Sequence, residues 1–361
     1  MITYSESIQI NALDYSRVVK YNINEVPFGK VFTDHMFIAD YKEGHWQNLR
    51  IVPYQKFEMS YAMSALHYGQ AIFEGMKAFR QDNGDVVVFR MRDNWARLNR
   101  SAVRMAMPEV PEEIFVEGLL QLLKLDKVWV PDSENGSLYI RPFMIATEEA
   151  IGVKISSEYQ FIIIASPAGV YYSKPIKALI QNTFYRSVKG GIGYVKAAGN
   201  YGRSLYPTKL AQDRGYQQIL WLDAEKGRYI EEAGTMNVMF VKNGTLITPE
   251  LTDTLLSGIT RDSVLKLARK MGIPTEERRV SVEEILTGIE KGEVTEAFGV
   301  GTAATVAHIT TIGREEGDLI RDYVLPPVEE RKYSHLFDKT LRDIRKGRIP
   351  DEFGWLIKVE R

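Results

Sequence analysis

The spacing of apolar and polar residues predicts both helices and strands in the first half of the chain. Apolar residues recur at helical spacing between 93 and 105, and again after Pro111, where Pro-Glu-Glu is typical of a first helical turn. Runs at Ser137–Ala146 and Tyr159–Ala165 are typical of strands, and Asn83-Gly84 between two apolar runs predicts a hairpin.

The second half of the chain shows the same mixture of patterns. The expected helices cover 202–213 (with Pro207 at a kink or a late start), 260–271 and 282–290, and the expected strands are 217–223, a hairpin over 237–248 and a strand–turn–strand unit over 293–311. Ser281 and Glu284 form a capping box before the last helix. Because tight turns join many strands, we expect mixed, largely antiparallel sheets.

The length and the linker signals predict an α/β (α+β) protein of two domains. A chain of 361 residues with 45% hydrophobic composition is long enough for two cores. Ser166-Pro167-Ala168-Gly169 is expected to break the strand pattern and to begin a linker. The predicted division is a small domain over 1–166, a linker over 167–178 and a large domain over 179–361.

Composition excludes several classes of function. The 46 basic and 47 acidic residues give a net charge of −1, which favours neither nucleic acid nor an anionic membrane as a partner. No secretory signal is visible at the N-terminus, and the longest apolar stretch is far shorter than a membrane span. The chain has no cysteine, its five histidines are scattered, and the common nucleotide-binding loops are missing. We therefore expect no metal site and a cytoplasmic protein.

Lys196 lies among five glycines between Gly190 and Gly202. Glycine lets the backbone approach another molecule closely, so this setting suits a lysine confined in a pocket, where its amine can act as a nucleophile or a base. A flexible surface loop with an ordinary lysine is the alternative, and this segment alone does not decide between them.

Three later features extend the case for a cofactor site. Glu232 lies between two predicted strands, and two small-residue turns, Gly258-Ile259-Thr260 and Gly301-Thr302-Ala303-Ala304, can offer backbone N–H groups to an anion. A lysine, a carboxylate and two such turns are what pyridoxal phosphate needs. Taken singly, Glu232 is equally compatible with a solvated charge and the first turn with a plain helix cap.

The order of six segments decides between these alternatives. They are Leu66–Arg80, Ser137–Pro142, Lys196–Tyr201, Glu232–Asn237, Gly258–Asp262 and Gly301–Ala304. In this order they resemble the fold-type IV aminotransferases, and most closely the branched-chain amino-acid aminotransferases, over nearly the whole chain. The resemblance implies a small N-terminal α/β domain, a larger C-terminal pseudo-barrel α/β domain, and a homodimer whose active site is shared between subunits.

The resemblance also assigns roles to individual residues. Lys196 matches the lysine that carries pyridoxal 5′-phosphate as a Schiff base and moves the substrate proton. Glu232 matches the partner of the pyridine nitrogen, and Tyr201 the donor to the phenolic oxygen. The residues that match the phosphate grip are Arg97, Ile259, Thr260 and Thr302.

The substrate pocket is assigned in the same way. Tyr68 and Phe73 match its aliphatic wall, joined by Tyr171 and Val153, while Tyr139 and Arg141 match its far edge, where arginine can pair with the distal carboxylate of glutamate. Thr235, Ala303 and Ala304 match further substrate contacts, and Gln218 a nearby position. Core packing is the alternative for the aromatic residues.

The implied reaction is reversible transamination between leucine, isoleucine or valine and 2-oxoglutarate, within amino-acid biosynthesis. D-amino-acid aminotransferases, aminodeoxychorismate lyases and amine transaminases share the lysine and the carboxylate, and a non-catalytic protein of the same fold is a further alternative. Some mammalian members carry a Cys-x-x-Cys pair where this chain has Ala304 and Ala307, so that thiol switch is absent.

Overall fold

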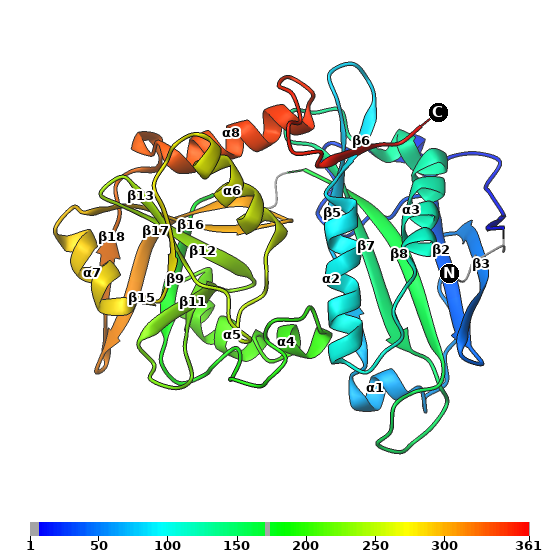
Figure 1. The fold of residues 1–361 in the computed structure, drawn as a ribbon, viewed down its shortest axis with the longest axis horizontal. Helices are drawn as coiled ribbons and strands as arrows, with labels where there is room; N and C mark the ends of the chain where they lie inside the picture. The colour runs from blue at the N-terminus through cyan, green and yellow to red at the C-terminus, as the bar shows by residue number, and fades with distance from the viewer. Residues whose placement is uncertain (1–6, 170–173, 361) are drawn as a thin grey trace. The chain divides into compact units, whose positions relative to one another are not determined.

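The computed structural model describes residues 7–169 and 174–360 (Figure 1). By its internal contacts the chain divides into two compact units. The first comprises Met1–Tyr171, Lys196–Ala198 and Asp343–Arg361, and the second comprises Tyr172–Val195 and Gly199–Arg342. The domain boundaries predicted above stay a prediction, and the contacts differ from them chiefly by giving residues 343–361 to the first unit.

The first unit is built on a nine-stranded sheet in the order β1-β3-β2-β8-β7-β5-β6-β19, with β4 paired to β7. Its strands are β1 (Gln9–Ile10), β2 (His35–Lys42), β3 (His45–Pro53), β4 (Ala71–Phe73), β5 (Met76–Arg80), β6 (Val86–Phe89), β7 (Ser137–Ala146), β8 (Tyr159–Ala168) and β19 (Leu356–Lys358). The hairpin predicted at Asn83-Gly84 is confirmed: it joins β5 to β6, and Gly84 takes the positive φ that the turn requires.

Helices cover this sheet. They are α1 (Ser64–Tyr68), α2 (Met91–Arg104) and α3 (Glu112–Asp126), with short 3₁₀ turns at Arg17–Lys20 and Lys127–Trp129. α3 packs on β2 so closely that a Cβ on Gly118 would fall 2.7 Å from the ring of Phe37. Phe115 of α3 stacks on Phe161 of β8 at 5.6 Å, which ties the helix to the centre of the sheet.

The linker expected to begin at Ser166 is wrong at its start, because β8 continues to Ala168. Residues 165–168 pair with the beginning of β7, Pro167 opposite Leu138. On its other side β8 pairs with β2 only between Tyr159 and Ile163. Pro167 therefore lies where the strand has a partner on one side only, and a missing N–H is tolerated there.

The second unit closes its strands into a ring. The order β12-β16-β17-β9-β10-β11 is completed by pairing of β11 with β12, so six strands form a barrel, with β13, β14, β15 and β18 attached outside the ring. Its strands are β9 (Ile176–Gln181), β10 (Gln218–Leu222), β11 (Tyr229–Ala233), β12 (Met236–Lys242), β13 (Thr245–Pro249), β14 (Thr275–Arg278), β15 (Val280–Ser281), β16 (Val294–Gly301), β17 (Thr305–Glu316) and β18 (Leu319–Val324).

The helices of this part of the chain are α4 (Ala198–Gly202), α5 (Leu205–Asp213), α6 (Ile259–Lys270) and α7 (Val282–Glu290), with a 3₁₀ turn at Val328–Glu330. Pro207 lies in the first turn of α5, where its missing N–H costs no helical hydrogen bond, so the predicted late start is confirmed. The capping box is confirmed as well, since Ser281 Oγ accepts from the N–H of Glu284. α8 (Tyr333–Arg345) contains the boundary between the two units.

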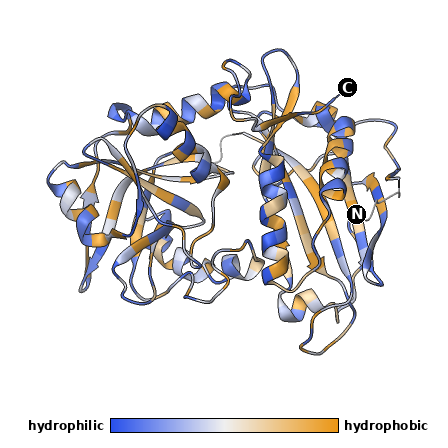
Figure 2. Cartoon of the chain, viewed as in Figure 1, coloured by the Kyte–Doolittle hydropathy of each residue, from blue (hydrophilic) through white to orange (hydrophobic). Residues whose placement is uncertain are grey.

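Apolar residues of the barrel strands form the core of the second unit. Leu220, Val238, Phe240 and Ile309 have no more than 1% of their surface exposed, and they belong to one packed cluster with residues of α7. Figure 2 shows the hydrophobic runs concentrated on strands in both units. Mixed sheets with helices packed on them confirm the expected α+β class.

Candidate active site

Lys196 is anchored to the first unit on both sides of its backbone. Its carbonyl accepts from the N–H of Phe73 at 3.1 Å, and its own N–H donates to Ser101 Oγ of α2 at 3.0 Å. Ala197 forms an isolated bridge with Ile72. The lysine is therefore fixed against β4 and α2, and the alternative of a loose surface loop does not hold.

The side chain of Lys196 lies in a cluster with three residues predicted for the substrate pocket. Its Nζ is 4.8 Å from the ring centroid of Phe73, and the Arg141 guanidinium is 4.5 Å from the same centroid. Arg141 Nη2 donates to the hydroxyl of Tyr139 at 2.9 Å. Tyr139 in turn covers Gly75, where any Cβ would collide with its hydroxyl. The structure thus brings Phe73, Tyr139, Arg141 and Lys196 together.

Other predicted pocket residues differ in their exposure. Tyr68 ends α1 and is half-buried, whereas Val153 is 91% exposed. Tyr171 lies outside the described residues. Pocket roles for these three residues stay predictions.

Arg97 is buried in α2 and forms a two-pronged ion pair. Its Nε and Nη2 lie 2.8 and 2.7 Å from the two oxygens of Glu74, whose side chain is fully buried. A buried carboxylate of this kind requires a cation beside it. Glu74 was not singled out in the sequence, although a glutamate between apolar strand residues is a usable signal. The phosphate contact predicted for Arg97 stays a prediction.

In the second unit, Glu232 is 3% exposed and held from several directions. Arg186 lies against it, with Nε 3.0 Å from Oε2 and Nη2 donating to Oε1 at 3.1 Å. The N–H of Leu256 also donates to Oε1, at 2.8 Å. The orientation of this carboxylate is therefore fixed, and the solvated alternative for Glu232 is excluded. Arg186 gave no signal in the sequence, because its partner lies 46 residues away.

Tyr201, Glu232 and Thr235 border one small hollow, together with Arg186, Asn200 and Ser204. Tyr201 lies on α4, where Asn200 fixes the approach by donating to the carbonyls of Ile192 and Val195 at 2.7 and 2.9 Å. Beside the hollow, Gly234 takes a positive φ and lies directly on Gln218, leaving no room for a side chain. The predicted hydroxyl donor and the predicted carboxylate thus share a concave surface.

Strand register places Glu232 near both predicted anion-binding turns. Glu232 pairs with Asn237 across β11 and β12, and Asn237 pairs with Val300 near the end of β16. Asn237 Nδ2 donates to the carbonyl of Leu256, and a Cβ on Gly258 would fall 1.8 Å from Asn237 Oδ1. The turn before α6 and the turn after β16 are therefore both tied to β12.

The turn at Gly258 opens a true helix. Gly258 is the N-cap of α6 and, within the described chain, gives no side-chain hydrogen bond to the first-turn amides, to which Ile259 and Thr260 belong. The helix dipole adds a partial positive charge at this end. Thr302, Ala303 and Ala304 form the second turn, between β16 and β17, and all three are half-buried.

These residues fit pyridoxal phosphate. A buried, oriented carboxylate suits a protonated ring nitrogen, a hydroxyl on the same hollow suits the phenolic oxygen, and a glycine-capped helix start suits a phosphate. The close contact between Gly258 and Asn237 is a cradle that a side chain would fill.

Comparisons with known proteins agree with this geometry. Residues 71–312 match the family model described as amino-transferase class IV. The match covers more than half of the chain, and the chain belongs to the class IV aminotransferases. It is therefore an enzyme of the aminotransferase class, and its cofactor is pyridoxal 5′-phosphate.

Relatives and solved structures confirm the resemblance to branched-chain aminotransferases. Branched-chain-amino-acid transaminase 1 of Bacillus subtilis (strain 168) is 44% identical over 92% of this chain and 94% of its own. The branched-chain aminotransferase of Thermoproteus uzoniensis, solved with norvaline, superposes with a TM-score of 0.74 at 27% identity, covering 90% of this chain and all of that one. The branched-chain amino acid aminotransferase of Escherichia coli has a TM-score of 0.73 at 28% identity, over 91% and 99% of the two chains.

One further solved structure holds a ligand that combines cofactor and amino acid. It is a bacterial-type branched-chain amino acid aminotransferase complexed with N-(5′-phosphopyridoxyl)-L-glutamate, and it superposes with a TM-score of 0.68 at 25% identity. The superposition covers 89% of this chain and 98% of that one.

Two further searches concern the described residues only. Within 7–169 and 174–360, no helix is long and apolar enough to cross a membrane. In the same ranges, no group of three or more histidine, cysteine, aspartate or glutamate residues is arranged to hold a metal ion.

Proposed function

We propose that this enzyme transfers the amino group of leucine, isoleucine or valine to 2-oxoglutarate, reversibly, giving branched-chain 2-oxo acids and L-glutamate. The observation that carries the proposal is the cluster around Phe73, where an amine and a guanidinium approach one aromatic ring at 4.8 and 4.5 Å. An apolar surface between these two groups suits an aliphatic amino acid at one moment and a dicarboxylate at the next.

Each residue has a defined task in this proposal. Pyridoxal phosphate supplies an electron sink that accepts the amino group of one substrate and passes it to the other. Lys196 carries the cofactor covalently, and its Nζ takes the proton from the substrate Cα, as a general base must do from within hydrogen-bond reach. Glu232, oriented by Arg186, would hold the cofactor ring nitrogen in its cationic form.

Arg141 is placed to select the second substrate. Its Nη2 is engaged by Tyr139, but its Nε is buried and has no hydrogen-bond partner among the described residues. A buried guanidinium donor without a partner is costly, and a substrate carboxylate would satisfy it. The solved branched-chain aminotransferase with a phosphopyridoxyl-glutamate supports glutamate as one of the two amino acids.

Covalent attachment at Lys196 can be tested directly. Borohydride reduction should fix the yellow cofactor to the wild type and to Lys189→Ala, which removes an exposed lysine seven positions earlier in the same glycine-rich segment. Lys196→Ala should bind the cofactor only reversibly and lose at least about 10³-fold in kcat, because it lacks the general base. Covalent fixation in Lys196→Ala would contradict the assignment.

Substrate choice is tested by half-reactions of the bound cofactor. Leucine, isoleucine and valine should bleach its absorption band rapidly, and D-alanine hardly at all. Equal or faster bleaching by D-alanine would favour a D-amino-acid aminotransferase. The homodimer with a shared active site and the cytoplasmic location remain predictions that rest on the family resemblance.

A further inference from the structure

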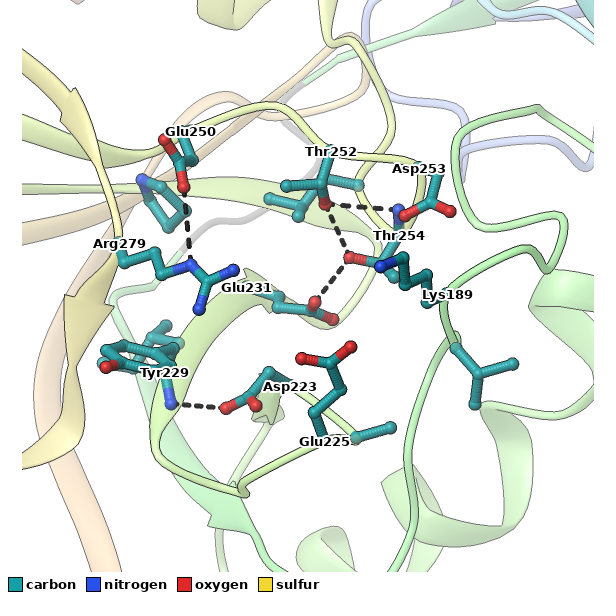
Figure 3. A pocket seen from close by; sticks show the side chains of 15 residues that line it. Lys189, Asp223, Glu225, Tyr229, Glu231, Glu250, Thr252, Asp253, Thr254 and Arg279 are labelled. Carbon is teal, nitrogen blue, oxygen red and sulfur yellow. Dashed lines mark hydrogen bonds and ion pairs between the residues drawn. The ribbon is translucent and has the colours of Figure 1, made fainter.

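A second pocket lies in the second unit, on the opposite side of β11 from Glu232. It measures about 210 Å³, and Figure 3 shows the side chains that line it. Glu231 and Glu232 are neighbours on β11, and successive side chains of a strand point to opposite faces. Glu232 therefore serves the hollow described above, while Glu231 lines this pocket.

Glu231 is a buried carboxyl group that is only half satisfied. It is 7% exposed, and its Oε1 accepts from the Thr254 hydroxyl at 2.5 Å. Its Oε2 is buried and has no hydrogen-bond partner among the residues that the structure describes. Leaving such an oxygen without a donor costs about 1–3 kcal/mol, so the pocket offers an acceptor that a ligand could satisfy.

The charges around Glu231 are mostly negative. Asp223, Glu225, Glu250 and Asp253 also line the pocket, against two bases, Lys189 and Arg279. In Figure 3 the carboxyl groups of Glu225 and Glu231 point toward the middle of the pocket.

Several of these charges are already fixed in place. Burial would raise the pKa of Asp223, but three backbone N–H groups at 2.6–2.8 Å outweigh it and lower the pKa below its usual range. Asp253 accepts from the N–H of Gly190 at 2.6 Å, and Arg279 is drawn to Glu250 at 3.5 Å. The pocket therefore keeps an excess of negative charge, which favours a cation.

The floor of the pocket is apolar. Ile230 and Leu255 are 2% and 4% exposed, and Pro249 is buried beside them. At about 210 Å³ the pocket is smaller than those of about 300–1,000 Å³ that hold drug-sized ligands. Its occupant must therefore be small, with a short hydrocarbon part and a charged head.

We propose that this pocket binds a small organic cation, a guanidinium or ammonium compound with a short aliphatic chain, whose N–H group donates to Glu231 Oε2. The site is separate from the residues assigned to transamination, and it does not rest on the proposed function. A metal ion is disfavoured as the occupant, because the described residues bring no three suitable ligands together.

The probe for this site is 1-butylguanidinium chloride. Unlike a primary amine, a guanidinium does not condense readily with the cofactor aldehyde, so binding at the active site does not imitate the effect. Its neutral isostere, butylurea, has the same shape without the charge. Titration calorimetry of the holoenzyme at pH 8 should show saturable binding of butylguanidinium with a Kd of about 1 mM or tighter, and none of butylurea.

Glu231→Gln keeps the shape of the side chain and should weaken butylguanidinium binding at least tenfold. The matched control is Glu283→Gln, which removes an exposed carboxylate of α7 outside the pocket and should bind like the wild type. No saturable binding to the wild type, or equal binding to Glu231→Gln, would overturn the proposal. Bleaching by leucine is measured on the same samples, so a failure here is distinguishable from a failure of the transaminase assignment.

A second measurement covers the case in which Glu231→Gln does not fold. Wild-type crystals soaked with butylguanidinium should show its head group within hydrogen-bond distance of Glu231 Oε2. A soaked crystal with the probe elsewhere, or with this pocket empty, would contradict the site.

Discussion

Arg186 shows how much of the site depends on a residue that touches no substrate in the proposed reaction. Its Nη2 donates to the carbonyls of Gly193 and Thr254 and to Glu232, at 2.9, 2.7 and 3.1 Å. It is 6% exposed. Because three elements converge on one guanidinium, Arg186 sets the position of the carboxylate and is a positioning residue.

Replacing Arg186 should therefore cost far more than removing a surface ion pair. Arg186→Met leaves the buried Glu232 carboxylate without its cation, and we expect the free energy of unfolding to fall by about 3–5 kcal/mol. Adding Glu232→Gln should recover part of that loss, because the uncompensated charge disappears. The control is Lys209→Met in the exposed Lys209–Asp213 pair, expected to cost about 0.5 kcal/mol. Urea unfolding of the four variants measures all terms, and strictly additive losses would contradict the coupling.

Glu231 and His308 should give the stability of the protein opposite dependences on pH. Burial raises the pKa of Glu231 to about 7, although Thr254 and Arg186 lower it, while burial and the charge of Arg331 lower the pKa of His308 to about 4. Between pH 4.5 and 7 the unfolded chain ionises Glu231 while the folded chain keeps it neutral, so stability falls as pH rises. His308 acts in the other sense, because stability falls as pH drops from 6.5 to 4.

Glu231→Gln separates these two contributions. From the difference between 7 and 4.5, the variant should gain up to about 3 kcal/mol relative to the wild type as pH rises through this range. Urea unfolding at pH 4.5, 5.5 and 7 measures the gain. Parallel curves for the two proteins would show that Glu231 has an ordinary pKa.

At the scale of elements, the start of α6 combines a helix cap with a close backbone approach. Gly258→Ala would place a methyl group 1.8 Å from Asn237 Oδ1, and Asn237 must then move away from Leu256 and from the row that it forms with Glu232. We expect the dissociation constant of pyridoxal phosphate to rise at least about tenfold, one 1.4 kcal/mol step, with the fold retained.

Gly202→Ala is the matched control for this prediction. In the described chain, no atom lies within 4 Å of a Cβ built on Gly202, and this glycine ends α4 beside Tyr201. Equilibrium titration of the apoenzyme with the cofactor, followed by absorbance, compares the two variants. Equal affinities would show that the α6 turn does not bind the phosphate.

Elements marked by local signals could be predicted from the sequence. The Asn83-Gly84 turn, the Ser281 capping box and the late start of α5 each depend on residues within one turn of the chain. The end of β8 could not be predicted, because Pro167 is tolerated only where β2 no longer pairs with β8, and that is a property of the sheet.

The site divides in the same way between local and distant information. Lys196, Glu232 and the glycine turns carry signals in short segments, and the family resemblance adds roles for Arg97 and Arg141. Glu74, Arg186 and Asn237 were missed, because each acts through a partner that only the folded chain brings near. The pocket beside Glu231 was missed for the same reason, since its lining comes from several separate segments.

At the scale of the whole molecule, residues beyond α8 return to the first unit. The N–H of Arg90 donates to the carbonyl of Trp355, and Trp355 is 5% exposed, stacked on Phe353 at 4.3 Å between ring centroids. β19 follows directly and pairs with β6. The first unit is thus assembled from separate stretches of chain, and Trp355 fixes the last of them.

Trp355→Ala should therefore destabilise the first unit. Loss of a buried tryptophan costs about 3–5 kcal/mol, and the denaturant midpoint of the first unit should fall accordingly. Phe57→Ala, which removes a ring that is 51% exposed, should leave the midpoint within about 0.5 kcal/mol of the wild type. Hydrogen exchange at β6 measures the local effect, and unchanged protection there would contradict the role of Trp355.

This return of the chain has a consequence for biosynthesis. The ribosome makes all of the second unit before it makes β19, so the nascent first unit waits with the edge of β6 uncovered while roughly half of the protein is translated. An uncovered strand edge is a template for pairing with other chains. Translation that stalls before Trp355 would thus release a product prone to aggregate, and chaperones have their greatest use for this protein in that interval.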